Sequence, residues 1–153
     1  MKAIGLKREE TVMTDERNAE RPVVLCVDDD PEILEALRRT LRHEPYDLLT
    51  LLDPAKVHDW IECRGVSLVI CDKCIPGTSG VELAQRMRTR KAGPLCVILT
   101  AYPERVPALE SLDSGIRALI HKPWNDEWLR KTIRRLLQER GDPAHAKIAE
   151  DAR

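Results

Sequence analysis

Six polar side chains of this sequence stand just after apolar runs. They are Asp28, Asp29, Asp30, Asp72, Thr100 and Lys122. Mg²⁺ prefers carboxylate oxygens and needs only one or two carboxylates from a protein, because it keeps several of its waters. A hydroxyl group and an ammonium group can hydrogen-bond to the charged oxygens of a phosphoryl group. These residue types therefore indicate a site for a hard divalent cation and a phosphoryl group, if the fold brings them together.

The apolar runs themselves have the length and composition of buried strands. Short continuous apolar runs are typical of strands that are covered on both faces of a parallel sheet. Five such strands are expected, at residues 22–27, 46–52, 66–71, 95–99 and 116–120. Helical spacing predicts helices at residues 31–43, 55–62, 81–90 and 125–140, and a short helix that begins near Pro107. This alternation implies an α/β fold, a five-stranded parallel sheet with helices on both faces.

The order of these elements brings the polar side chains to one edge of the sheet. Ligands of such folds bind outside the carboxyl ends of the strands, and the candidate residues all follow strand ends. Asp29 and Asp72 can supply metal ligands, with Asp28 holding a metal-bound water. The cation and Lys122 would neutralise a phosphoryl group on Asp72, and Thr100 would hydrogen-bond to it.

Four motifs carry a resemblance to a known family. VLCVDDDPEILEALRRTL, VICDKCIPGTSGVELAQRMR, VILTAY and LIHKPW resemble, in order and spacing, the receiver domain of two-component response regulators. The resemblance implies the flavodoxin-like, doubly wound receiver fold. It also implies that an aspartate accepts a phosphoryl group from a sensor histidine kinase or a phosphotransfer protein, in a Mg²⁺-dependent reaction.

The family's motifs also imply the role of each site residue. The phosphoacceptor position is Asp72, and Thr100 and Lys122 correspond to the family's hydroxyl residue and lysine. The metal ligands that the resemblance implies are Asp28, Asp29, Asp72 and the backbone carbonyl of Cys74. A lysine–proline bond of this family is typically cis, and an X–Pro bond carries only a small cis penalty.

The domain organisation expected from the sequence is simple. Residues 1–21 are predicted to be a mobile N-terminal arm, residues 22–140 the receiver domain, and residues 141–153 a short polar C-terminal tail. The chain is then expected to be a stand-alone phosphoacceptor whose only enzyme-like activity is autodephosphorylation. Its expected partners are a downstream protein target and a second copy of the chain, in a homodimer. A net charge of −1 argues against direct DNA binding. A signal peptide and a membrane-length apolar run are both absent, which predicts a cytoplasmic protein.

The pair Cys71 and Cys74, in CDKC, raises the alternative of a zinc site or a redox pair. A structural zinc site needs four nitrogen or sulfur ligands, and no second CxxC lies near in sequence. Side chains alternate along a strand, so Cys71 should point away from the face that presents Asp72 and into the core. A redox role stays open because a CxxC motif can lower the pKa of a thiol.

Two further functions stay open. The family often has an aromatic switch residue three positions before its lysine, and here Leu119 takes that position, which leaves room for a phosphate-independent, receiver-like interaction module. A haloacid-dehalogenase-type phosphatase would use Asp28 as its nucleophile and Asp30 as its second acid. That function leaves Asp72 without a role, and Asp30 is more typical of a helix N-cap.

Overall fold

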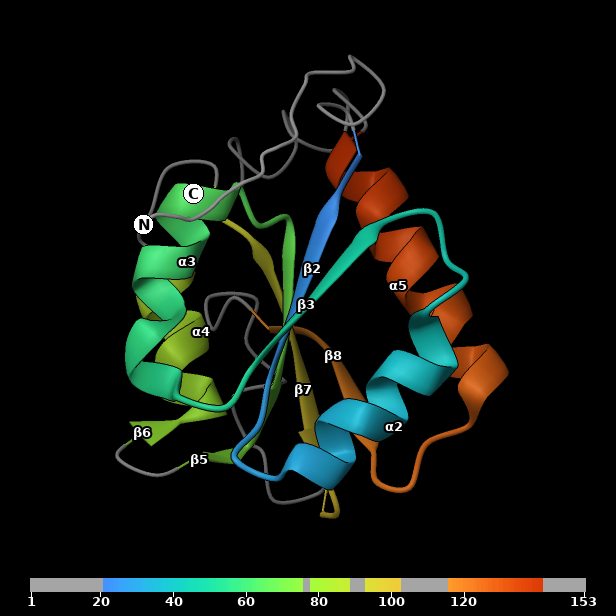
Figure 1. The fold of residues 1–153 in the computed structure, drawn as a ribbon, viewed down its shortest axis with the longest axis horizontal. Helices are drawn as coiled ribbons and strands as arrows, with labels where there is room; N and C mark the ends of the chain where they lie inside the picture. Colours follow the sequence, from blue (N-terminus) through green and yellow to red (C-terminus); the bar gives the residue numbers. More distant parts are fainter. Residues whose placement is uncertain (1–20, 76–77, 89–92, 103–115, 142–153) are drawn as a thin grey trace.

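The computed structural model describes residues 21–75, 78–88, 93–102 and 116–141 (Figure 1). The strands of its main sheet are β2 (Val23–Val27), β3 (Asp47–Leu51), β4 (Leu68–Asp72), β7 (Leu95–Thr100) and β8 (Ile116–His121). The helices are α2 (Pro31–Leu41), a 3₁₀ turn η1 (Pro54–Lys56), α3 (Val57–Arg64), α4 (Gly80–Arg88) and α5 (Asp126–Gly141). A short antiparallel ribbon, β5 (Cys74–Ile75) and β6 (Thr78–Ser79), separates β4 from α4. The short helix expected near Pro107 lies outside the described residues, as do the two predicted tails apart from Arg21 and from Gly141, which is the last residue of α5.

The five strands of the main sheet are parallel, in the order β3-β2-β4-β7-β8. This order confirms the expected fold class. The chain leaves β2 towards one edge of the sheet and then returns past β2 to continue towards the other edge. The direction therefore reverses between β2 and β4, and ligands of such sheets bind at the carboxyl ends of the strands beside this point.

Two hydrophobic layers cover the sheet, with α2 and α5 on one face and α3 and α4 on the other (Figure 1). Alternate residues of each strand enter opposite layers, as the pleat of a strand requires. In β2, for example, Val24 and Cys26 pack towards α2 and α5, whereas Leu25 and Val27 pack towards α3 and α4. Burial on both faces explains why the strands read as continuous apolar runs in the sequence.

Local contacts define where two of the loops that leave the sheet begin. The side chain of Asp30 accepts a hydrogen bond from the backbone N–H of Glu32, and Pro31 is the first residue of α2. Strand β4 extends one residue beyond its predicted end, because Asp72 still pairs with Leu99 of β7. The predicted phosphoacceptor is therefore the last residue of a central strand, and its backbone is fixed by the sheet.

Candidate functional site

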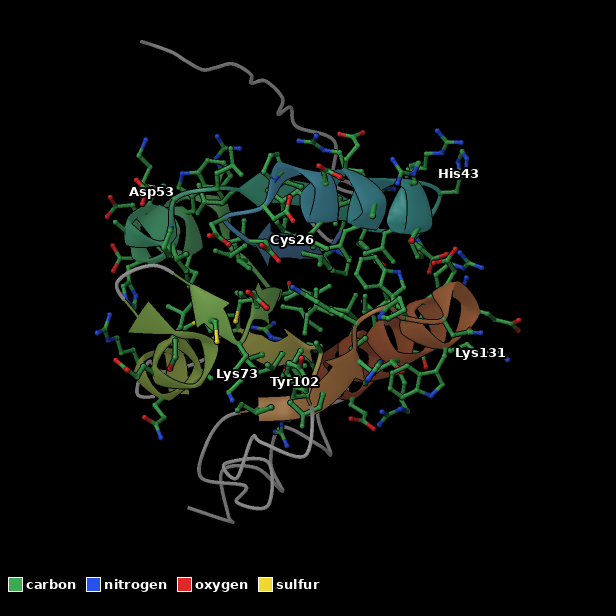
Figure 2. The ribbon with its side chains drawn as sticks, turned by 90° about the horizontal axis from the view of Figure 1, so that it is seen from below. Cys26, His43, Asp53, Lys73, Tyr102 and Lys131 are labelled. Carbon is green, nitrogen blue, oxygen red and sulfur yellow. The ribbon has the colours of Figure 1, made fainter. Side chains whose placement is uncertain are left out.

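Three carboxylates meet at the carboxyl edge of the sheet, which Figure 2 views end-on. Oxygen atoms of Asp28, Asp29 and Asp72 lie within 4.8 Å of one another. Asp28 and Asp29 follow β2, and Asp72 ends the neighbouring strand β4. The parallel sheet thus brings together acids that are more than forty positions apart in the sequence. Among the described residues, this triad is the one group of three or more potential metal ligands of the Asp, Glu, His and Cys types.

A lysine side chain joins the acids from the position directly after β8. The Nζ atom of Lys122 lies 2.9 Å from Oδ1 of Asp72 and 3.3 Å from Oδ2 of Asp28. Burial alone would lower the pKa of Lys122, but the hydrogen bond to Asp72 and the charges of both carboxylates outweigh burial and raise it above 10.5. The ammonium group is therefore charged at neutral pH. Counted as three carboxylates and one ammonium group, the cluster has a formal net charge of minus two.

Asp28 is the buried member of the triad, with 1% of its surface exposed. Its Oδ1 accepts a hydrogen bond of 2.9 Å from the backbone N–H of Asp30. Burial raises the pKa of Asp28, and the charge of Asp72 adds to this effect, while the Asp30 N–H and Lys122 oppose it. The internal partners thus compensate the buried charge only in part. A carboxylate set of this charge fits a hard divalent cation.

The hydroxyl group of the site comes from the end of β7. Thr100 is 4% exposed, and its Oγ1 accepts a hydrogen bond of 3.0 Å from the backbone N–H of Tyr102. The carbonyl of Thr100 accepts the backbone N–H of Lys122 at 2.8 Å, so the two residues are held side by side. The side chain of Tyr102 is 54% exposed beside this edge.

The ribbon of β5 and β6 turns the chain back onto the site, so that α4 begins against Asp72. The backbone N–H of Gly80 donates to the carbonyl of Lys73 at 2.8 Å. A Cβ atom at Gly80 would lie only 2.6 Å from the carbonyl oxygen of Asp72 and 2.8 Å from Cδ1 of Ile98. Sequence reasoning missed this close approach, although PGTSG, directly after CDKCI, was its signal. Cys74 is exposed in β5, and the role of its carbonyl as a metal ligand stays a prediction.

The structure separates the two sulfurs of CDKC. Cys71 is fully buried in the layer under α3 and α4, as predicted, and its Sγ lies 3.9 Å from Sγ of Cys96. This contact and burial raise the pKa of the Cys71 thiol well above 9.0. Cys74 is exposed instead. A protonated thiol in the core has neither the reactivity nor the access of a redox cysteine, so the geometry favours the core role.

Comparison with known proteins gives the family. Residues 24–134 match the response regulator receiver domain. The chain therefore belongs to the receiver domain family of two-component response regulators. A receiver domain is a signalling phosphoacceptor module rather than a classical enzyme, and receiver domains interact with histidine kinases.

The curated relatives are longer proteins. The chain is 32% identical, over 116 residues, to the hydrogenase transcriptional regulatory protein HoxA of Bradyrhizobium diazoefficiens, covering 75% of this chain and 24% of the relative. It is 30% identical to the DNA-binding response regulator MtrA of Mycolicibacterium smegmatis, covering 81% of this chain and 54% of the relative. The chain thus spans about a quarter to a half of the length of these relatives.

Solved structures agree with the fold. The signal receiver domain of an HD domain-containing protein from Pseudomonas fluorescens Pf-5 is 28% identical, with a TM-score of 0.73 over 80% of this chain and 98% of that one. A CheY-like receiver domain protein from Methanospirillum hungatei JF-1 is 27% identical, with a TM-score of 0.71 over 80% and 98% of the two chains.

Family membership decides against the dehalogenase-type alternative, and the side chain of Asp30 caps α2 instead of joining the triad. Leu119, at the usual aromatic position, is partly buried against the layer under α3 and α4. Within the described ranges, no helix is both long enough and apolar enough to span a membrane.

Proposed function

We propose that this chain is a phosphorylation switch in which Asp72 accepts a phosphoryl group from a sensor histidine kinase or a phosphotransfer protein. The observation that carries the proposal is the contact of Lys122 with both Asp72 and Asp28, inside a triad of carboxylates. Asp72 is 17% exposed at its side chain, so it is held in place and still accessible to a donor. Asp28 is buried and is suited to binding a cation rather than attacking a donor.

The donor set of the site supports Mg²⁺ as the cofactor. The formal net charge of minus two and the incompletely compensated charge of Asp28 fit a divalent cation with oxygen ligands. Asp28, Asp29, Asp72 and the backbone carbonyl of Cys74 would hold it. When bound, the cation neutralises charge that develops on the transferred phosphoryl group.

Three side chains of the protein would carry out the transfer of the phosphoryl group. A carboxylate oxygen of Asp72 forms a bond to phosphorus while the P–N bond of the phosphohistidine breaks, and the imidazole nitrogen leaves with the electron pair. The ammonium group of Lys122 then pairs with a phosphoryl oxygen in place of part of its contact with Asp72. Because Oγ1 of Thr100 accepts from Tyr102, its own proton is available for another phosphoryl oxygen.

The output of the switch is a contact with a downstream protein target or with a second copy of the chain. A net charge of −1 supports protein contacts over direct DNA binding, since the latter relies on a basic surface. A cytoplasmic location fits a phosphodonor that is an intracellular kinase. We expect hydrolysis of its own acyl phosphate to be the only enzyme-like activity of the chain.

The test is the intact mass of the purified protein after incubation with acetyl phosphate, with and without Mg²⁺. We expect one phosphoryl adduct that requires Mg²⁺ and that Asp72→Asn abolishes. The matched control is Asp47→Asn, which changes an exposed aspartate paired with Arg21 far from the site and should leave the adduct intact. An adduct that survives in Asp72→Asn, or no adduct from either acetyl phosphate or a phosphorylated histidine donor, would contradict the proposal.

A further inference from the structure

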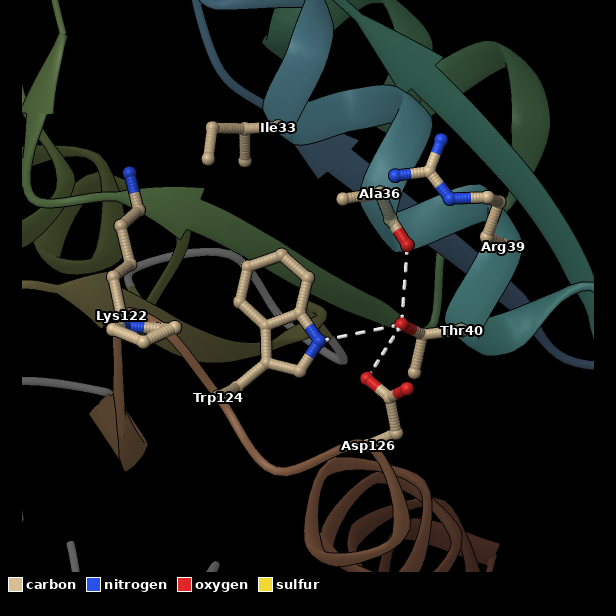
Figure 3. A pocket seen from close by; sticks show the side chains of 8 residues that line it. Ile33, Ala36, Arg39, Thr40, Lys122, Trp124 and Asp126 are labelled. Carbon is tan, nitrogen blue, oxygen red and sulfur yellow. Dashed lines mark hydrogen bonds between the residues drawn. The ribbon is translucent and has the colours of Figure 1, made fainter.

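A network of hydrogen bonds joins α2 to the turn that follows Lys122 (Figure 3). The indole Nε1 of Trp124 donates to Oγ1 of Thr40 at 3.3 Å. The Oγ1 atom of Thr40 also lies 2.9 Å from Oδ1 of Asp126 and 3.1 Å from the carbonyl oxygen of Ala36. A hydroxyl group has one proton and two acceptor sites, so Thr40 accepts from Trp124 and donates to one of the two oxygens.

Thr40 also accepts a hydrogen bond through its backbone carbonyl. Nη1 of Arg130, on α5, donates to the carbonyl oxygen of Thr40 at 3.2 Å. Trp124 packs against the hydrophobic layer under α2 and α5, and its side chain is only partly exposed. Thr40 is thus the point at which α2, the turn after β8 and the start of α5 are tied together, across more than eighty positions of sequence.

Direct packing between the Lys122 segment and α2 is incomplete. A surface pocket of about 550 Å³ is lined by Lys122 and Pro123 together with Ile33 and Ala36 of α2 (Figure 3). Apolar contact therefore fixes this side of the segment only in part. The hydrogen bonds of Thr40, at the other end of the same pocket, supply a directional contact between the turn and α2.

Contacts on both the N-terminal and the C-terminal side of Lys122 hold its backbone in place. On its N-terminal side, the backbone N–H bonds to the carbonyl of Thr100, which fixes it to the sheet. On its C-terminal side, the chain passes through Pro123 to Trp124, whose indole is held by Thr40. A lysine side chain is long and flexible, and an ammonium group that must meet a phosphoryl oxygen works best when its backbone is held on both sides.

We propose that Thr40 is a positioning residue for the phosphorylation of Asp72, acting through Trp124 on the segment that carries Lys122. This inference rests on the proposed function. It assigns a role in the reaction to a residue of α2 that has no hydrogen bond to Asp28, Asp29 or Asp72, or to Lys122, in the described network. The hydroxyl group, rather than the size of the side chain, carries the role.

The test compares Thr40→Val with Thr40→Ser. Valine has nearly the shape of threonine but cannot accept the indole N–H, whereas serine keeps the hydroxyl group. The rate of adduct formation is measured by intact mass with phosphoramidate and Mg²⁺. In this reaction Asp72 forms the P–O bond, the P–N bond breaks, and the protonated nitrogen leaves as ammonia. Phosphoramidate is too small to need a docking surface on α2, so a slower reaction reports on the site.

We expect Thr40→Val to lower the rate at saturating phosphoramidate by about three- to tenfold, with little change in the concentration that gives half-maximal rate. Thr40→Ser should react at close to the wild-type rate. The matched control Thr132→Val alters a buried threonine of α5 that the network does not include, and it should leave the rate unchanged.

A second variant removes the same bond from its other side. Trp124→Phe keeps an aromatic ring but lacks the N–H, and it should slow the reaction to a similar extent. If the bond carries the effect, the double variant with Thr40→Val is no slower than either single variant. If Thr40→Val fails to fold, Trp124→Phe is tested alone. A slow reaction of Trp124→Phe then supports the inference, and a wild-type rate overturns it.

The inference fails separately from the proposed function. Absence of any adduct in the wild-type protein would overturn both. A wild-type adduct, together with a Thr40→Val rate equal to wild type, would overturn the positioning role alone. Additive effects of the two single variants would overturn the link through the indole hydrogen bond.

Discussion

A methyl group at Gly80 tests how closely α4 must approach the phosphoacceptor. In Gly80→Ala, the new Cβ would lie 2.6 Å from the carbonyl oxygen of Asp72 and 2.8 Å from Cδ1 of Ile98. Ordinary van der Waals contact begins near 3.4 Å, so the helix and the strand must separate by about 0.8 Å on the carbonyl side. The Ile98 side chain can rotate away from the methyl group, but the Asp72 carbonyl is part of the backbone of β4, which still pairs with Leu99 of β7 at this residue, and it moves less easily.

We expect this strain to lower the free energy of unfolding by about 1–3 kcal/mol. It should also slow phosphorylation by acetyl phosphate by about tenfold, because the shift is applied to the backbone of the reacting residue. The first effect is measured by urea unfolding and the second by intact mass against time. A lower urea midpoint, with an unchanged slope of the unfolding free energy against urea concentration, would show that the variant has lost stability without a change in the surface that unfolding exposes.

The matched control is Gly65→Ala. Gly65 is the C-cap of α3 and has φ +61°, where alanine is disfavoured, but nothing lies within 4 Å of the added Cβ. This change should cost about 1 kcal/mol of stability without slowing phosphorylation. If Gly80→Ala is as stable as the wild type, or if both variants phosphorylate equally fast, the close contact with Asp72 does not constrain the site and the reasoning is refuted.

Three further outcomes follow from the charges of the structure. In Mg²⁺-free buffer, Asp28→Asn should raise the free energy of unfolding near neutral pH by about 1 kcal/mol, because it removes a buried charge. The folded-state pKa of Asp28 is raised above 3.8, so this gain should shrink as the pH falls through that pKa. Added Mg²⁺ should stabilise the wild type but not the variant, and urea unfolding at several pH values, with and without Mg²⁺, checks these statements. The pKa of Lys122 is raised above 10.5, so the ion pairs of Lys122 add to the free energy of unfolding below pH 10.5 and this contribution is lost as the pH rises through the folded-state pKa. The free energies of unfolding of Lys122→Gln and the wild type should therefore differ least at high pH. A difference that stays constant with pH would argue against the ion pairs. Arg134→Ala leaves Glu44 buried without its partner at 2.6 Å and should lower the urea midpoint more than Lys131→Ala, whose ion pair is exposed; equal midpoints would contradict this.

Residues at strand ends are the part of the site that sequence could predict. Asp28, Asp72 and Thr100 each follow an apolar run, and the geometry of parallel sheets requires such ends to meet at one edge. The cap at Asp30 was equally local, because aspartate before proline is a typical helix start. The buried direction of Cys71 followed from the two-residue repeat of a strand.

Contacts that depend on which elements become neighbours could not be predicted in this way. The approach of Gly80 to Asp72 depends on the path of a short ribbon, which no hydrophobic period reveals. The bond between Thr40 and Trp124 joins residues 84 positions apart, and their types suggest only a helix surface and an aromatic in a turn. Local patterns fix where an element begins and which face it buries, whereas such pairs arise only when the layers are assembled.

The contact of Lys122 with two carboxylates has a consequence for ion selectivity. The ammonium group is a monovalent counter-ion that is covalently tethered, so dilution or dialysis cannot remove it. One Na⁺ or K⁺ would balance only one of the two formal negative charges that remain once this counter-ion is counted. A divalent ion instead balances the remaining charge of the cluster, and it can do so while the lysine stays in place. Lys122 thereby matches the formal charge left on the cluster to that of one divalent ion, which is the kind of ion that the proposed function requires.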